Sequence, residues 1–137
     1  MSDQDDYSLH VLVIDDQQTM RSIVRRLLHA IGIQDVAEAD GGEEALDYLI
    51  DPHTRLPDVI ICDLHMDRMD GLQFCNSLRR KEGLKNASVP VLILTGNRDR
   101  FVHEVTLQVG ALSVLTKPVT ADELKHEISE AVGYSLA

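Results

Sequence analysis

The sequence predicts an α/β domain in which a five-stranded parallel sheet is sandwiched by five helices. Two observations support this prediction. Short apolar runs rich in branched residues recur along the chain, and segments whose apolar residues follow helical spacing separate them. Strands and helices that alternate in this way form a parallel sheet with helices on both faces. A chain of 137 residues is long enough to form one such domain with its own core.

The first four elements follow directly from the start of the chain. The run LHVLVI at 9–14 is short and rich in branched residues, which is typical of a strand. Residues 20–31 place their apolar side chains, Ile23 among them, on one helix face, and a glycine suited to end the helix follows. The run QDVAEA at 34–39 predicts a short strand. Residues 42–50 predict a short helix that ends before a proline.

The middle of the chain repeats this alternation. The run PDVIIC at 57–62 predicts a buried strand, because it is continuously apolar after its first two residues. Residues 71–83 predict a helix with Leu72 on its inward face. The run VPVLIL at 89–94 predicts the fourth strand, and residues 99–109 predict the helix after it.

The C-terminal part adds the last strand and helix. The run LSVLT at 112–116 predicts the fifth strand, and residues 120–132 predict the fifth helix. Thr120 is suited to be the N-cap of this helix, because Glu123 stands three residues later as the partner in a capping box.

Charge and composition limit the partners and the location. The net charge of -10 argues against nucleic acid or an anionic membrane as a direct partner, since either would need a basic face. The chain has no signal peptide and no apolar run of about 18 residues, which predicts a cytoplasmic protein without membrane insertion. Cys62 and Cys75 lie in apolar patterns and are expected to be buried thiols. We expect residues 1–8 to form a short disordered acidic tail and residues 9–134 to form the domain.

Two of the predicted strands end in aspartates. Asp15 and Asp16 follow the first strand, and Asp63 follows the third. Ligand sites of open α/β sheets lie beyond the carboxyl ends of the strands, so these carboxylates converge if the two strands are neighbours. Converging anions repel one another, and Mg²⁺ is a natural partner because it prefers oxygen ligands. Each aspartate alone is as easily a helix N-cap or a turn residue, but two acidic strand ends together favour a metal site.

The fourth and fifth strands end in a hydroxyl and an amine. Thr95 ends the fourth strand, and Lys117 follows the fifth. A lysine and a hydroxyl beside a metal site suit the binding of a phosphoryl group. Alone, Lys117 is more simply a surface charge and Thr95 a strand-end residue, but the whole set rarely arises by chance.

The motifs VIDDQ, IICDLHMDRMDG, ILTG and GALSVLTKP occur in this order at successive strand ends. With them, residues 9–132 resemble the response-regulator receiver domain, the CheY-like family of two-component signalling. The resemblance implies the flavodoxin-like strand order 2-1-3-4-5. It also implies a stand-alone, single-domain response regulator. Such a protein is a signalling switch that catalyses only its own phosphotransfer and autodephosphorylation.

The resemblance implies a role for each residue at the strand ends. Asp63 would accept a phosphoryl group from a phosphohistidine on a histidine kinase or a histidine phosphotransfer protein. Thr95 and Lys117 would bind the phosphoryl oxygens, and the peptide bond between Lys117 and Pro118 is expected to be cis. The expected Mg²⁺ ligands are oxygen atoms of four residues: Asp15, Asp16, Asp63 and, through its backbone carbonyl, His65.

The chain departs from the family pattern at two positions. Asp67 stands where the family commonly has proline, four residues after the phosphoacceptor, and we hypothesise that it alters metal affinity or loop mobility. Val114 stands three residues before the lysine, where many members have an aromatic residue whose rotation reports phosphorylation. Valine is stiff about χ1 and cannot swing in this way. Phe101 and His103 are alternative contributors, although ordinary helix positions explain them more simply.

The resemblance also implies two binding surfaces and a choice of roles. A downstream protein target would bind the fourth helix, fifth strand and fifth helix. The phosphodonor would contact the first helix, where Arg21, Arg25 and Arg26 either attract an acidic partner or form a solvated face. The protein would be a chemotaxis-like messenger, a relay intermediate or a phosphate sink. The alternatives are a receiver-fold module that binds proteins without phosphate, and a Mg²⁺-dependent phosphatase or phosphotransferase of another α/β family.

Overall fold

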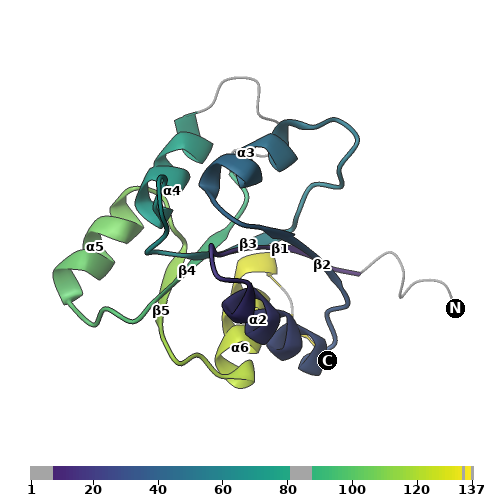
Figure 1. Cartoon of the computed structure of the whole chain (residues 1–137). Coiled ribbons are helices and arrows are strands. Elements are labelled where there is room, and N and C mark those ends of the chain that lie inside the picture. The colour runs from purple at the N-terminus through teal and green to yellow at the C-terminus, as the bar shows by residue number, and fades with distance from the viewer. Residues whose placement is uncertain (1–7, 81–87, 134, 137) are drawn as a thin grey trace, which may run out of the picture.

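The computed structural model describes residues 8–80, 88–133 and 135–136. Its five strands are β1 (His10–Ile14), β2 (Asp35–Ala39), β3 (Val59–Asp63), β4 (Val91–Thr95) and β5 (Ser113–Thr116). They form one sheet in the order β2-β1-β3-β4-β5, and each neighbouring pair is parallel (Figure 1). The predicted fold class and strand order are confirmed.

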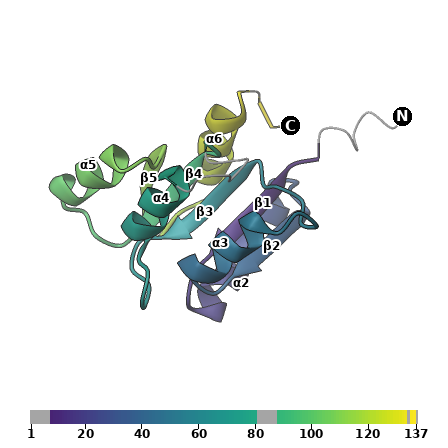
Figure 2. The same ribbon diagram turned by 90° about the horizontal axis from the view of Figure 1, so that it is seen from above.

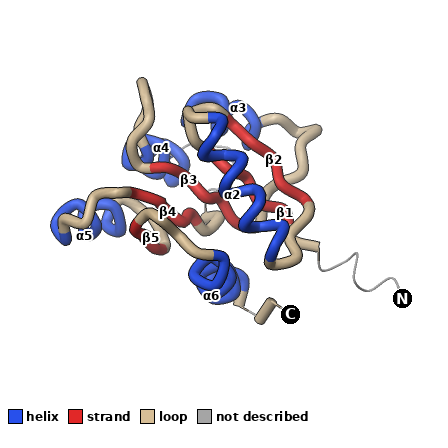
Figure 3. Tube along the Cα trace, turned by 60° about the horizontal axis from the view of Figure 1, so that its bottom comes forward, coloured by secondary structure: helices blue, strands red, loops and turns tan. Residues whose placement is uncertain are grey.

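Helices cover both faces of the sheet. They are α2 (Gln18–Ala30), α3 (Gly42–Ile50), α4 (Gly71–Arg80), α5 (Arg100–Gln108) and α6 (Ala121–Val132). In Figures 1 and 2, α2 and α6 lie on one face, and α3, α4 and α5 lie on the other. Figure 3 brings α2 and α6 to the front of the sheet. In a sheet covered on both faces in this way, a site is expected at the carboxyl ends of the strands.

Each face of the sheet has its own apolar core. Leu12 and Ile14 of β1 pack in the core under α3 and α4, whereas Val11 and Val13 pack in the core under α2 and α6. Successive strand residues point to opposite faces, so a strand buried on both sides needs a continuous apolar run. Strands β1, β3 and β4 are buried at every position, which explains why their sequences are largely apolar. A strand of this kind holds the residue at its end in a fixed position.

Three local details test the predicted helix faces and ends. The capping box of α6 is confirmed, because Thr120 Oγ1 accepts the Glu123 N–H and Glu123 Oε1 accepts the Thr120 N–H. Ile23 was expected inward but is 41% exposed, since α2 is buried around Val24. Leu72 is partly buried and packs against the core, as expected, while Phe74 of the same helix is fully buried.

Some predictions fall partly outside the described residues. The expected acidic tail covers residues 1–8, of which 1–7 are not described. The end of the helix predicted over 71–83 falls on 81–83, and the predicted end of the domain falls on 134, and these residues are not described either. Cys62 and Cys75 are free and buried, as expected. No helix within 8–80, 88–133 or 135–136 is long and apolar enough to cross a membrane.

Candidate functional site

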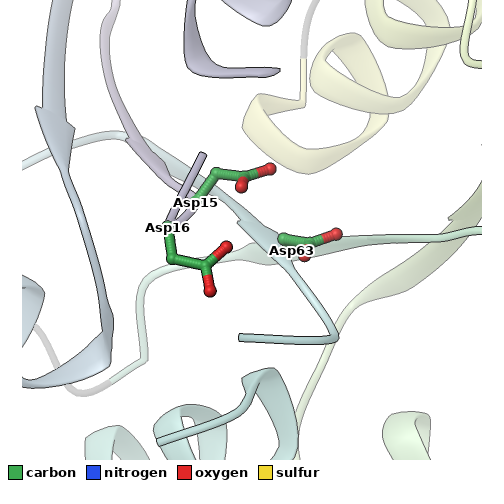
Figure 4. A group of neighbouring side chains, drawn as sticks. All are labelled: Asp15, Asp16 and Asp63. Atoms are coloured by element: carbon green, nitrogen blue, oxygen red, sulfur yellow. The ribbon is translucent and has the colours of Figure 1, made fainter. Parts of the chain in front are cut away.

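The three predicted aspartates meet at the carboxyl edge of the sheet. Strands β1 and β3 are direct neighbours, and their register pairs Ile14 with Cys62. Asp15 directly follows Ile14, and Asp63 directly follows Cys62, so these two aspartates occupy neighbouring positions. Asp16 comes one residue after Asp15. Carboxylate oxygens of Asp15, Asp16 and Asp63 all lie within 4.8 Å of one another (Figure 4).

Lys117 provides a positive charge beside this acidic group. Its Nζ lies 2.6 Å from Asp63 Oδ1, and the two side chains are only 25% and 8% exposed. The Lys117 N–H donates to the Thr95 carbonyl at 2.8 Å, which fixes the backbone of the residue directly after β5. The Lys117–Pro118 peptide bond is cis, as expected. One lysine beside three carboxylates leaves the group with excess negative charge.

The environment of Asp15 disfavours a further negative charge in the acidic group. Burial raises the pKa of the Asp15 carboxyl, a hydrogen bond from the Gln17 N–H opposes the rise, and the nearby Asp63 adds to it. The Gln17 N–H donates to Asp15 Oδ1 at 2.9 Å. Gln17, rather than either aspartate, is the N-cap of α2, so the N-cap alternative for Asp15 and Asp16 is wrong. Asp15 instead forms a local turn while facing another anion.

The loop after β3 is anchored against the end of that strand. The Leu64 N–H donates to the Leu94 carbonyl at 2.9 Å, and the Gly71 N–H donates to the Leu64 carbonyl at 2.8 Å. A Cβ at Gly71 would lie 2.8 Å from the Asp63 carbonyl oxygen, so only glycine fits there without displacing the backbone. His65 is exposed on this loop, and the use of its carbonyl as a metal ligand stays a prediction.

Asp16 receives a hydrogen bond from the same loop. The Asp67 N–H donates to Asp16 Oδ2 at 3.0 Å. Both residues also line an open cavity of about 490 Å³, which is bordered by further acidic residues of α3 and the turn before it. No sequence pattern predicts this bond, because the two residues are 51 positions apart.

Thr95 is linked to the helix that follows it. It is fully buried at the end of β4, and its Oγ1 accepts the Asn97 N–H at 3.0 Å. The Asn97 carbonyl in turn lies 2.6 Å from His103 Nε2 on α5. The sequence indicates Thr95 and His103 separately, but no pattern in it predicts the two contacts through Asn97 that join them.

The arginines of α2 are engaged within the protein. Arg21 Nε and Arg25 Nη2 lie 2.9 and 2.7 Å from opposite oxygens of Glu38 on β2. Arg21 also donates through Nη1 to the Asp15 carbonyl at 2.7 Å. These contacts favour a structural role for Arg21 and Arg25, whereas Arg26 is exposed.

The donor atoms of the site suit a hard divalent cation. The acidic group offers carboxylate oxygens from three residues, and no thiol or imidazole belongs to it among the described residues. Mg²⁺ prefers oxygen ligands and typically takes one or two protein carboxylates. The residues at the edge of the sheet therefore fit Mg²⁺.

Fold and site together define a flavodoxin-like α/β domain with an acidic, lysine-containing pocket at the carboxyl edge of its sheet. Residues 11–129 match the family described as the response regulator receiver domain, and the chain belongs to this family. Receiver domains are switches in two-component signalling, where they interact with histidine kinases and downstream targets and bind Mg²⁺ at an acidic pocket. The resemblance inferred from the motifs is confirmed.

Two relatives and one solved structure illustrate the similarity. The chain is 32% identical over 126 residues to a probable chemotaxis protein CheY of Rhizobium etli, covering 91% of this chain and 93% of the relative. It is 33% identical over 122 residues to the chemotaxis protein CheY of Pseudomonas aeruginosa, covering 89% and 94%. It also superposes on a putative response regulator from Chloroflexus aurantiacus with a TM-score of 0.81 and 28% identity, covering 92% and 98%.

Proposed function

We propose that this protein accepts a phosphoryl group on Asp63 from a phosphohistidine donor and thereby changes its affinity for a partner protein. The contact between Lys117 Nζ and Asp63 Oδ1, at 2.6 Å, is the observation that carries this proposal. A lysine in that position can move from the carboxylate to a phosphoryl oxygen attached to it.

The transfer needs positioning and charge neutralisation more than covalent chemistry by the protein. A carboxylate oxygen of Asp63 forms a bond to phosphorus as the bond from phosphorus to the donor histidine nitrogen breaks. The electron pair of that bond stays with the imidazole. Burial at the end of β3 holds the Asp63 nucleophile in place for this displacement. Thr95 Oγ1 and Lys117 Nζ bind the oxygens of the transferred group.

Asp15, Asp16 and Asp63 would hold Mg²⁺, together with the carbonyl of His65. When bound, the ion neutralises the negative charge of the carboxylates and the phosphoryl oxygens. The excess of carboxylates over cations at this edge of the sheet supports this role.

We infer that the output surface consists of α5, β5 and α6. The Asn97 N–H donates to Thr95 Oγ1, and the Asn97 carbonyl accepts from His103 Nε2, which gives a route from the site to α5. Val114 is half-buried against the core on the α5 side. Because valine cannot perform the rotation of an aromatic side chain, the route through His103 takes the place of that rotation. Phe101 is 70% exposed on α5 and offers an apolar contact to a partner protein.

The chemotaxis proteins among the relatives favour the messenger role over a relay or a phosphate sink.

Intact-mass spectrometry after incubation with acetyl phosphate and Mg²⁺ tests the proposal. The wild type should gain one phosphoryl group, and EDTA or Asp63→Asn should abolish the gain. Glu130→Gln on α6 is a matched control that removes one carboxylate far along the chain and should leave the gain intact. A wild type that stays unmodified with acetyl phosphate and also with a phosphohistidine donor would contradict the proposal and favour the phosphate-independent binding module.

A further inference from the structure

The bond between Asp67 and Asp16 joins two separate parts of the site. Asp16 lies between β1 and α2, and Asp67 lies on the loop between β3 and α4. The donor is the backbone N–H of Asp67, at 3.0 Å from Asp16 Oδ2. A hydrogen bond to an ionised carboxylate is roughly twice as strong as one between neutral groups. The bond therefore restricts the rotation of the Asp16 carboxylate while leaving Oδ1 outside it.

We propose that the backbone amide of Asp67, rather than its side chain, is a positioning group for the metal site, because it orients the Asp16 carboxylate. This inference rests on the proposed role of Asp16 as a Mg²⁺ ligand. Ligand carboxylates are themselves held by hydrogen bonds, and loss of such a partner typically weakens metal binding by about 10–100-fold. A residue without an N–H, which means proline, cannot supply this bond.

The loop fixes the position of the amide independently of the Asp67 side chain. The Leu64 N–H ties the start of the loop to Leu94 of β4, and the Gly71 N–H ties its end back to the Leu64 carbonyl. Arg68, the residue after Asp67, has a φ of 66°, so the chain turns sharply at this point through the left-handed region. The backbone therefore directs the N–H to Asp16 whatever side chain residue 67 carries.

The side chain of Asp67 has a weaker effect on Asp16 than the backbone N–H of the same residue. It is exposed and lines the open acidic cavity, where solvent and salt screen its charge. Removal of its carboxylate changes the potential around Asp16, but it leaves the N–H in place. The two contributions of residue 67 can therefore be separated by choosing substitutions that keep or remove the amide hydrogen.

The experiment is a Mg²⁺ titration by isothermal calorimetry, without any phosphodonor, on wild type, Asp67→Ala and Asp67→Pro. Asp67→Ala keeps the N–H and should bind within about twofold of wild type, as expected for a screened surface charge. Asp67→Pro removes the N–H and should bind about tenfold more weakly than Asp67→Ala. Equal or tighter binding by Asp67→Pro than by Asp67→Ala would overturn the proposal.

A second measurement detects the bond itself and does not depend on how Asp67→Pro folds. In the metal-free protein, amide exchange followed by NMR should be slow at residue 67 in wild type and in Asp67→Ala, and faster in Asp16→Ala. An exchange rate at residue 67 that Asp16→Ala leaves unchanged overturns the proposal. Wild type that binds no Mg²⁺ overturns both this proposal and the metal role in the proposed function. Wild type that binds Mg²⁺ while the two variants at position 67 bind equally overturns this proposal alone.

Discussion

Asp15 has two opposite effects on the stability of the folded protein. Its Oδ1 accepts the Gln17 N–H and so stabilises the turn before α2. The same carboxyl is only 4% exposed and lies among carboxylate oxygens of Asp16 and Asp63. Burial raises its pKa, the Gln17 N–H opposes the rise, and the neighbouring Asp63 charge adds to it. The folded, metal-free protein therefore loses stability when this group ionises.

Replacing Asp15 with asparagine should stabilise the metal-free protein by about 1 kcal/mol at neutral pH. Asparagine keeps an oxygen for the Gln17 N–H but carries no charge. Because the folded-state pKa of Asp15 is raised, the folded protein binds more protons, and stability falls as pH rises from the ordinary carboxyl value of 3.8 through the folded value. The gain from Asp15→Asn should therefore shrink in acid.

Urea unfolding in EDTA measures this effect, at neutral pH and again in acid. Asp47→Asn is the matched control, because Asp47 is exposed on α3 and its replacement should change the free energy of unfolding little. A lower free energy of unfolding for Asp15→Asn than for wild type at neutral pH would show that the charge of Asp15 does not destabilise the metal-free protein.

Glu38 joins an edge strand to a helix. Strand β2 has only one neighbour in the sheet and is partly exposed, so apolar burial holds it less firmly than the central strands. Arg21 and Arg25 of α2 donate to opposite oxygens of Glu38. Arg21 also contacts the carbonyl of Asp15, so this ion pair links the edge strand, the helix and the start of the acidic site.

The replacement Glu38→Gln should lower the free energy of unfolding by roughly 0.2–1 kcal/mol at neutral pH, the range of exposed ion pairs. Burial alone would raise the pKa of Glu38, but hydrogen bonds from Arg25 and Arg21 outweigh it and lower the pKa. The stabilisation is therefore present above the ordinary value of 4.5 and disappears as pH falls through the lower, folded value. Thermal unfolding of both proteins across this acid range should show the two curves converging. A difference in stability that is independent of pH would assign the effect to packing instead of charge.

At the scale of the whole molecule, the sequence could predict the architecture because burial imposes periodicity. The continuous runs that became β1, β3 and β4, and the capping box of α6, are local patterns with one simple structural meaning. The parallel order also brought Asp15, Asp16 and Asp63 together, since residues that end neighbouring strands share an edge. Contacts between a side chain and a backbone group outside its own helix or strand have no such signature. The bonds from the Asp67 N–H to Asp16 and from Arg21 to the Asp15 carbonyl were therefore missed.

The net charge of -10 gives the whole molecule a general response to salt, and a specific metal site must be distinguished from it. Screening by any salt reduces repulsion among the carboxylates and stabilises the folded chain modestly. A ligand that binds only the folded state at ten times its Kd adds about 1.4 kcal/mol. We therefore expect Mg²⁺ at that concentration to raise the free energy of unfolding by this amount above NaCl of equal ionic strength.

Chemical unfolding in the two salts measures the difference, and Asp16→Ala provides the decisive comparison. This variant removes one proposed ligand but only one of the many negative charges, so it should keep the response to NaCl and lose most of the additional response to Mg²⁺. Equal stabilisation of the wild type by both salts at matched ionic strength would mean that the converging aspartates act only as part of the overall charge. A Mg²⁺ increment that depends on Asp16 would instead tie the stability of the whole fold to the carboxyl edge of its sheet, because an ion that binds only the folded state there stabilises that state relative to the unfolded chain.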